Sequence, residues 1–217
     1  MILLSNKLWF PPVDTASPEG VVAIGGDLST DRLLLAYQSG IFPWFNQGEP
    51  VIWHSPNERM VLFPEELKVS KSMKQVLKKD EFLVTFNQSF KEVIRACKTT
   101  YRAGQGGTWI TNEMEQAYIK LYELGHAKSV EVWKFVNSDR NNKELVGGLY
   151  GVDLGTVFCG ESMFSNVSNA SKVAFVKLVE KLKQEQYKLI DCQVYNDHLA
   201  SLGAREISRV NFLKFLK

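Results

Sequence analysis

The feature that most constrains this chain is a regular alternation of helical and extended segments from residue 61 to the C-terminus. Apolar periodicity and capping residues predict helices at 70–78, from Ser89 onward, from Thr111 or Asn112 to about residue 124, and at 170–186. Apolar runs predict strands at 82–86, 129–136, 145–152, 156–159 and 189–193. The polar segment 137–143 joins two of these strands as an antiparallel hairpin, and short helical segments are expected at 196–202 and 210–215. This order predicts an α+β domain with one mixed sheet flanked by helices.

The first 60 residues follow a different pattern, because they are rich in Pro and Gly and poor in long periodic segments. They contain one well-marked helix, which Ser29 or Thr30 caps and Gly40 ends. We therefore expect a small, irregular N-terminal domain over residues 1–60 and a larger domain over residues 61–217.

The charge balance excludes a polycationic protein, because 26 Lys and Arg residues face 24 Asp and Glu residues, a formal net charge of +2. Any contact with nucleic acid must therefore come from a local basic patch. The predicted helix at 70–78 carries such a patch, which we call the lysine cluster: Lys71, Lys74, Lys78 and Lys79. Without a nucleic-acid partner, a cluster of this kind is simply a solvated helix face.

The sequence does not indicate export, a membrane span or a metal site. The N-terminus has neither a basic leader nor a small-residue cleavage site, and no run approaches 18 consecutive apolar residues. The three cysteines form no C-x-x-C pair, which is typical of a reduced, intracellular protein. The three histidines belong to no metal-binding motif, so we expect no metal.

Glycines surround the segment with the densest group of functional candidates. Glycine within a strand usually permits the close approach of a ligand or of another backbone, and glycines recur in segments 147–151 and 155–160. Glu161 and Ser162 follow a predicted strand and precede a helix, a common place for functional groups. A glycine-assisted sheet with a solvated Glu161 is the alternative. A serine hydrolase is not indicated, because Phe164 stands where the nucleophile motif needs glycine.

A second group of candidates combines a carboxylate, an amide and several indoles. Strand alternation places Asp191 and Gln193 on one face, where they could orient an amine and relay its proton. The alternative for Asp191 is a carboxylate satisfied by backbone donors. Trp44, Trp53 and Trp109 lie in stretches rich in Pro or Gly, where exposed aromatics can stack on nucleobases. Core packing is the alternative for each of them.

A series of short motifs extends over nearly the whole chain. In order they are GGDL at 25–28, GIFPW at 40–44, WHSP at 53–56, GTWI at 107–110, SVEVW at 129–133, VGGLYG at 146–151, GESMFS at 160–165, NASK at 169–172, IDCQ at 190–193 and SLGA at 201–204. Together with Arg59, this series closely resembles the bacterial leucyl/phenylalanyl-tRNA–protein transferases.

The resemblance implies a cytoplasmic enzyme that moves Leu or Phe from its tRNA to the α-amine of a protein beginning with Arg or Lys. The product is marked for degradation by the N-end rule pathway. The resemblance also implies that residues 61–217 form a catalytic domain similar to the GCN5-related N-acetyltransferases. No cofactor is expected, because an aminoacyl ester is already activated toward an amine. We expect a monomer that does not bind a membrane.

The same resemblance implies roles for individual residues. Asp191 with Gln193 is the proton relay, and Glu161, with Ser162 beside it, helps to hold the acceptor's N-terminus. The lysine cluster would meet tRNA phosphates. Residues near the terminal adenosine would be Trp109 and Tyr118. The pocket for the acyl side chain would be formed by Trp44, Leu149, Phe158, Phe175, Leu178 and Ile190.

Two other functions stay open at this point. An acyl-CoA-dependent N-acetyltransferase could have the same fold, but such enzymes hold pyrophosphate with R/Q-x-x-G-x-G/A, and the segment RAGQG at 102–106 has the wrong spacing. A non-catalytic tRNA-binding module would bind tRNA without transferring an amino acid.

Overall fold

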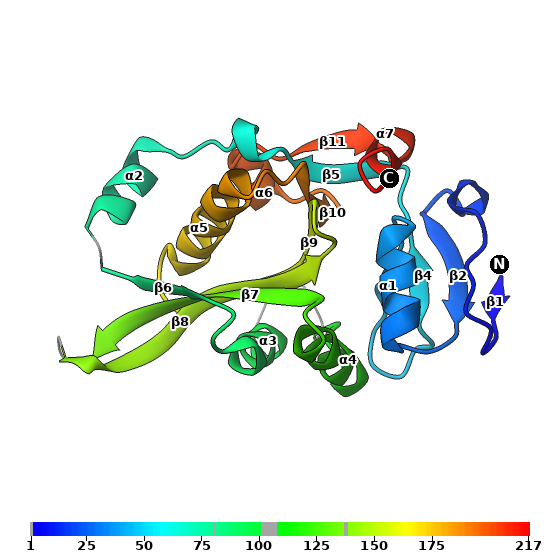
Figure 1. Cartoon of the computed structure of the whole chain (residues 1–217), viewed down its shortest axis with the longest axis horizontal. Coiled ribbons are helices and arrows are strands. Elements are labelled where there is room, and N and C mark those ends of the chain that lie inside the picture. Colours follow the sequence, from blue (N-terminus) through cyan, green and yellow to red (C-terminus); the bar gives the residue numbers. More distant parts are fainter. Residues whose placement is uncertain (1, 80, 101–107, 137–138) are drawn as a thin grey trace.

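A four-stranded sheet organises the N-terminal part of the chain in the computed structural model, which describes residues 2–79, 81–100, 108–136 and 139–217. Its strand order is β1-β2-β4-β3, and α1 packs beside it (Figure 1). The elements are β1 (Leu3–Leu4), β2 (Val21–Gly25), α1 (Thr30–Gln38), β3 (Phe42–Pro43) and β4 (Ile52–His54), with a 3-10 turn at Val13–Thr15. The sequence did not predict the four short strands of this sheet. These strands are too short, and too often bounded by Gly or Pro, to show alternation in the sequence.

A seven-stranded mixed sheet forms the larger part of the molecule, with the strand order β11-β5-β10-β9-β8-β7-β6. All neighbouring pairs are antiparallel except β9 and β10, which are parallel. The strands are β5 (Glu58–Leu62), β6 (Leu83–Phe86), β7 (Ala127–Val136), β8 (Asp139–Asp153), β9 (Val157–Ser165), β10 (Leu189–Gln193) and β11 (Arg205–Ser208). The predicted α+β class with one mixed sheet in the larger domain is confirmed.

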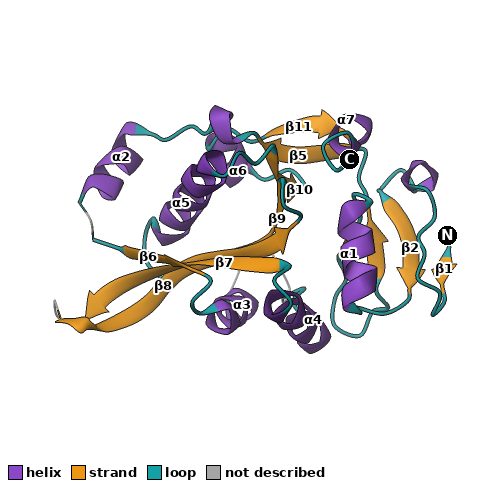
Figure 2. Ribbon diagram, viewed as in Figure 1, coloured by secondary structure: helices purple, strands orange, loops and turns teal. Residues whose placement is uncertain are grey.

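Helices cover both faces of this sheet, with α3 and α4 on one face and α5 on the other (Figures 1 and 2). Two adjacent glycines of β8 show this directly. A Cβ on Gly147 would lie 2.5 Å from Cβ of Ala170 in α5, whereas a Cβ on Gly148 would lie 3.3 Å from Val93 in α3. The helices are α2 (Lys71–Lys78), α3 (Phe90–Thr99), α4 (Asn112–Glu123), α5 (Ala170–Gln184), α6 (Asp197–Ser201) and α7 (Arg209–Leu213), with a 3-10 turn at Pro64–Glu66.

Two of the predicted strands are longer than the sequence indicated. β8 begins at Asp139, so most of the predicted polar turn 137–143 belongs to this strand, and residues 137–138 lie outside the described residues. β9 continues through Glu161 and Ser162 to Ser165, so these two residues lie within a strand and do not follow it. In both cases backbone pairing with the neighbouring strand extends the ladder past the apolar run.

The two sheets share one hydrophobic core on the side of α3 and α4. That core joins Leu33, Phe42 and Trp53 of the N-terminal part to Phe90 and Tyr150 of the larger part, while a second core lies under α5. Along the chain, the first strand of the large sheet is β5, which begins at Glu58. No helix in the described part of the chain is long and apolar enough to span a bilayer.

Candidate active site

A cavity of about 800 Å³ opens in the large sheet and brings together most of the predicted site residues. Its size is typical of a small-molecule or cofactor site. The predicted residues that line it are Trp44, Trp109, Leu149, Phe158, Glu161, Ser162, Phe175, Leu178, Ile190 and Gln193. Two predicted residues, Tyr118 and Asp191, are fully buried and are not among the lining residues.

The inner wall of the cavity is apolar because three adjacent strands and one helix contribute large side chains to it. Leu149 of β8, Phe158 of β9 and Ile190 of β10 come from neighbouring strands, and Phe175 and Leu178 come from α5 above them. All five are at most 4% exposed. This wall can accept an aliphatic or aromatic side chain but offers it no polar partner.

Aromatic side chains lie at the rim of the cavity. Trp44 follows β3 and is 46% exposed, and the backbone carbonyl of Trp44 lies 3.1 Å from Nε2 of His54. Trp109 precedes α4 and is partly exposed. Trp53, by contrast, is fully buried, and its indole Nε1–H donates to the carbonyl of Gly25 at 2.8 Å. Trp44 and Trp109 can therefore stack on a planar ligand, whereas Trp53 fills the core.

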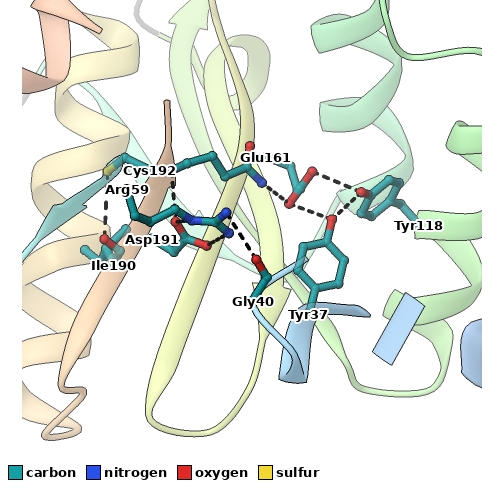
Figure 3. Close-up of polar contacts among 9 residues, drawn as sticks. Tyr37, Gly40, Arg59, Tyr118, Glu161, Ile190, Asp191 and Cys192 are labelled. Atoms are coloured by element: carbon teal, nitrogen blue, oxygen red, sulfur yellow. Dashed lines mark hydrogen bonds and ion pairs between the residues drawn. The ribbon is translucent and has the colours of Figure 1, made fainter. Parts of the chain in front are cut away.

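Glu161 occupies the polar end of the cavity and is held by three donors. The hydroxyl of Tyr37 donates to Oε1 at 2.8 Å, and the hydroxyl of Tyr118 donates to Oε2 at 3.0 Å (Figure 3). The amide Nε2 of Gln193 donates to Oε1 at 2.9 Å. Burial raises the pKa of Glu161 to about 7, against the lowering effect of these three hydrogen bonds. Glu161 can therefore change its protonation state at neutral pH.

Asp191 lies behind the cavity in a buried ion pair. Nε and NH2 of Arg59 donate to the two carboxylate oxygens of Asp191 at 2.7 and 2.6 Å (Figure 3). Both side chains are at most 1% exposed. The Asp191 carboxylate also accepts the backbone N–H of Gln193 at 2.9 Å. Asp191 therefore does not reach the cavity, and it contacts the site through Gln193.

Gln193 connects the two carboxylates because β10 is irregular at this point. The pairing of β10 with β5 shifts register between Asp191 and Gln193, and Gln193 has a φ of 65°. The alternation that predicted Asp191 and Gln193 on one face of the strand therefore ends before Gln193. Its backbone turns toward Asp191 while its side chain reaches Glu161.

Several residues of the site were not predicted in the role that the structure gives them: Tyr37 was not predicted at all, and Arg59 was noted only as part of the motif series. Tyr37 and Arg59 bind the two carboxylates from the first 60 residues. Tyr118, expected near the adenosine of the tRNA, instead donates to Glu161 from inside the core. Further residues that line the cavity but were not predicted include Phe42, Asn46, Gln47, Met163, Cys192, Val194, Tyr195 and His198.

The lysine cluster lies on α2, away from the cavity, and all four side chains are exposed. Lys79 pairs with Glu81 at 3.7 Å, whereas the other three form no ion pair with any described residue. No group of three or more His, Cys, Asp or Glu side chains among the described residues could hold a metal ion.

Comparisons with known proteins identify the chain over its full length. The family model "Leucyl/phenylalanyl-tRNA protein transferase" matches residues 61–217, and the model of the N-terminal domain of the same family matches residues 26–57. A protein named leucyl/phenylalanyl-tRNA–protein transferase from Flavobacterium johnsoniae is 60% identical over 217 residues, covering 100% of this chain and 99% of its own. The protein of the same name from Flavobacterium psychrophilum is 59% identical, with both chains covered completely. Among solved structures, FemX has a similar fold, with a TM-score of 0.54 at 10% identity, over 82% of this chain and 66% of its own.

Proposed function

Because this chain belongs to the leucyl/phenylalanyl-tRNA–protein transferase family, and is thus an enzyme that transfers an amino acid from aminoacyl-tRNA to a protein, we propose that its acceptors are proteins beginning with Arg or Lys. Transfer would mark these proteins for degradation, and the enzyme would act as a cytoplasmic monomer. Family membership decides against the two alternative functions, a CoA-dependent acetyltransferase and a non-catalytic tRNA-binding module. The segment 102–106, considered for CoA binding, lies outside the described residues.

The observation that carries the proposal is that the cavity has one apolar wall and one anionic group. Glu161 is the single acidic side chain among the described residues that line the cavity. An acceptor beginning with Arg or Lys brings two positive charges, one on its α-amine and one on its side chain. A partly buried carboxylate attracts such a terminus more strongly than a neutral one.

The reaction needs little more than the positioning of two substrates. An aminoacyl ester is already activated, so holding the amine against the ester carbonyl removes most of the entropic barrier. We propose that the apolar wall, with Trp44 at its rim, holds the Leu or Phe side chain and that Trp109 stacks on the terminal adenosine. In this arrangement Gln193 and Glu161 contact the acceptor amine, and Asp191 orients Gln193.

Acceptor selectivity tests the proposal. The enzyme is incubated with radiolabelled Leu-tRNA and a set of proteins that differ only in their first residue: Arg, Lys, Ala or Glu. We expect label on the Arg and Lys proteins to exceed label on the Ala protein by roughly tenfold or more, which corresponds to about 1.4 kcal/mol. Equal labelling of all four proteins would contradict the proposed acceptor class.

The lysine cluster gives a second prediction, because each phosphate contact contributes to the salt dependence of tRNA binding. Replacing Lys71 and Lys74 by Gln should weaken binding of aminoacyl-tRNA and lower the slope of log K against log salt by roughly 1–2. The matched control replaces Lys177 and Lys181 of α5, which already pair with Glu180 and Glu185 at 2.8 and 2.7 Å. A larger change of slope in the control would show that tRNA lies over α5 and not over α2.

A further inference from the structure

The three side chains that surround the polar end of the cavity form a closed ring of hydrogen bonds, which we call the carboxyl–tyrosine ring: Tyr37 of α1, Tyr118 of α4 and Glu161 of β9. Each tyrosine hydroxyl contacts one carboxylate oxygen, at 2.8 and 3.0 Å, and the two hydroxyls contact each other (Figure 3). Both tyrosines are at most 1% exposed. The ring thus joins the N-terminal part of the chain to the carboxylate in the cavity.

The number of protons in the ring determines how many of its contacts are hydrogen bonds. When Glu161 is ionised, the two tyrosines supply two protons for three oxygen–oxygen contacts, so one contact has no proton. When Glu161 carries a proton on Oε2, that oxygen donates to Tyr118, Tyr118 donates to Tyr37, and Tyr37 donates to Oε1. All three contacts are then hydrogen bonds. The ring can therefore take up a proton on Glu161 without losing any of its contacts, while its two hydroxyl donors favour the ionised form and lower the pKa of Glu161.

Burial and a neighbouring negative charge favour proton uptake by Glu161 at neutral pH. The Asp191 carboxylate of β10 opposes a second negative charge nearby, and it acts with burial to raise the pKa of Glu161. Arg59 of β5 already pairs with Asp191 through both carboxylate oxygens. Burial and the neighbouring Glu161 raise the pKa of both ring tyrosines, and burial raises the pKa of the Cys159 thiol, so these groups stay protonated.

We propose that Glu161, positioned by Tyr37 and Tyr118, takes the proton from the attacking amine, and that Asp191 is a positioning residue that acts through Gln193. The ammonium of the acceptor gives one proton to Glu161, and its freed lone pair forms a bond to the ester carbonyl carbon. The carbon–oxygen bond to the ribose breaks, and the ribose oxygen takes the second proton from the nitrogen. Glu161 then releases its proton to solvent. The inference rests on the acyl transfer of the family and not on the acceptor class proposed above.

The pH dependence of kcat/KM for the acceptor, measured with Leu-tRNA saturating, tests this role. For the wild type we expect kcat/KM to fall as the pH drops through about 7, where Glu161 becomes protonated. Glu161→Gln should lower kcat/KM on the order of 10²-fold and remove the acid limb near pH 7. Its residual rate should rise with pH through the pKa of the acceptor amine, about 7.7–8.0, because only the free amine can then react.

Tyr37→Phe tests the ring without removing the carboxylate. The ionised form of Glu161 loses a donor, so its pKa should rise and the acid limb should move to higher pH by about one unit. Tyr122→Phe is the matched control, because Tyr122 lies one turn from Tyr118 on α4 and its hydroxyl donates to the carbonyl of Asn87 instead. The control should leave the acid limb where it is.

Three results would overturn the inference. An acid limb near pH 7 that persists in Glu161→Gln but disappears in Asp191→Asn would make Asp191 the proton acceptor. A raised KM with an unchanged kcat and acid limb in Glu161→Gln would leave Glu161 a binding group only. If Glu161→Gln does not fold, as judged by circular dichroism, an unmoved acid limb in Tyr37→Phe is the result that overturns it. Transfer to acceptors lacking Arg or Lys would count against the acceptor class alone.

Discussion

Replacing Arg59 by Met should lower the free energy of unfolding by about 3–5 kcal/mol, because the Asp191 carboxylate is left buried without its partner. The ion pair is fully buried, since the Arg59 side chain is 1% exposed and the Asp191 side chain is 0% exposed. The guanidinium also lies 4.6 Å from the ring centroids of both Phe42 and Phe212, and its NH1 donates to the carbonyl of Gly40 at 3.3 Å. The loss therefore affects contacts between the two sheets as well as the ion pair.

The molecule contains a matched control for this substitution. Arg205 of β11 makes a similar two-pronged pair with Glu66, at 2.9 and 3.1 Å, and lies 4.7 Å from the ring of Phe63. Both side chains of this pair are exposed, at 51% for Arg205 and 42% for Glu66. Arg205→Met should therefore cost no more than about 1 kcal/mol. Urea unfolding of both variants measures the difference, and equal costs would show that burial of the Arg59 pair is not what determines its contribution.

The helices were the most predictable elements, because their ends carry local signals. Ser70 and Thr111, predicted at helix starts, accept the backbone N–H of Met73 and Met114 through their side chains. Strands β5 and β11 were not predicted. Charged residues such as Arg59 and Arg205 interrupt their apolar pattern, and both strands depend on partners far away in the chain. Local periodicity contains no information about such partners.

The residues of the site also differ in how well the sequence predicts them. The apolar strands predicted that Leu149, Phe158 and Ile190 are buried, and only the family resemblance implied that they line a pocket. The polar network could not be predicted, because its contacts join residues 124 positions apart for Tyr37 and Glu161, and 132 positions apart for Arg59 and Asp191. Nothing in the sequence around Tyr37 distinguishes it from an ordinary core tyrosine of an amphipathic helix.

The second large effect is expected at Gly151, where β8 and β9 approach too closely for a side chain. A Cβ at this position would lie 2.2 Å from the carbonyl oxygen of Cys159 and 2.6 Å from the ring of Phe158. The pairing of these strands shifts register between Tyr150 and Gly151. Because neither backbone can move without disturbing the ladder, Gly151→Ala should cost about 3 kcal/mol of unfolding free energy, at the upper end of the range for overpacking.

Gly160, the residue paired with Gly151 across the ladder, is the control for this prediction. A Cβ on Gly160 would meet only the carbonyl oxygen of Asp191, at an ordinary contact distance of 3.6 Å. Gly160→Ala should therefore change the free energy of unfolding by less than about 1 kcal/mol. A similar loss in both variants would mean that any alanine in this ladder is destabilising. A loss confined to Gly151→Ala would show that the close approach of Cys159 and Phe158 to this glycine, and not the ladder in general, excludes a side chain.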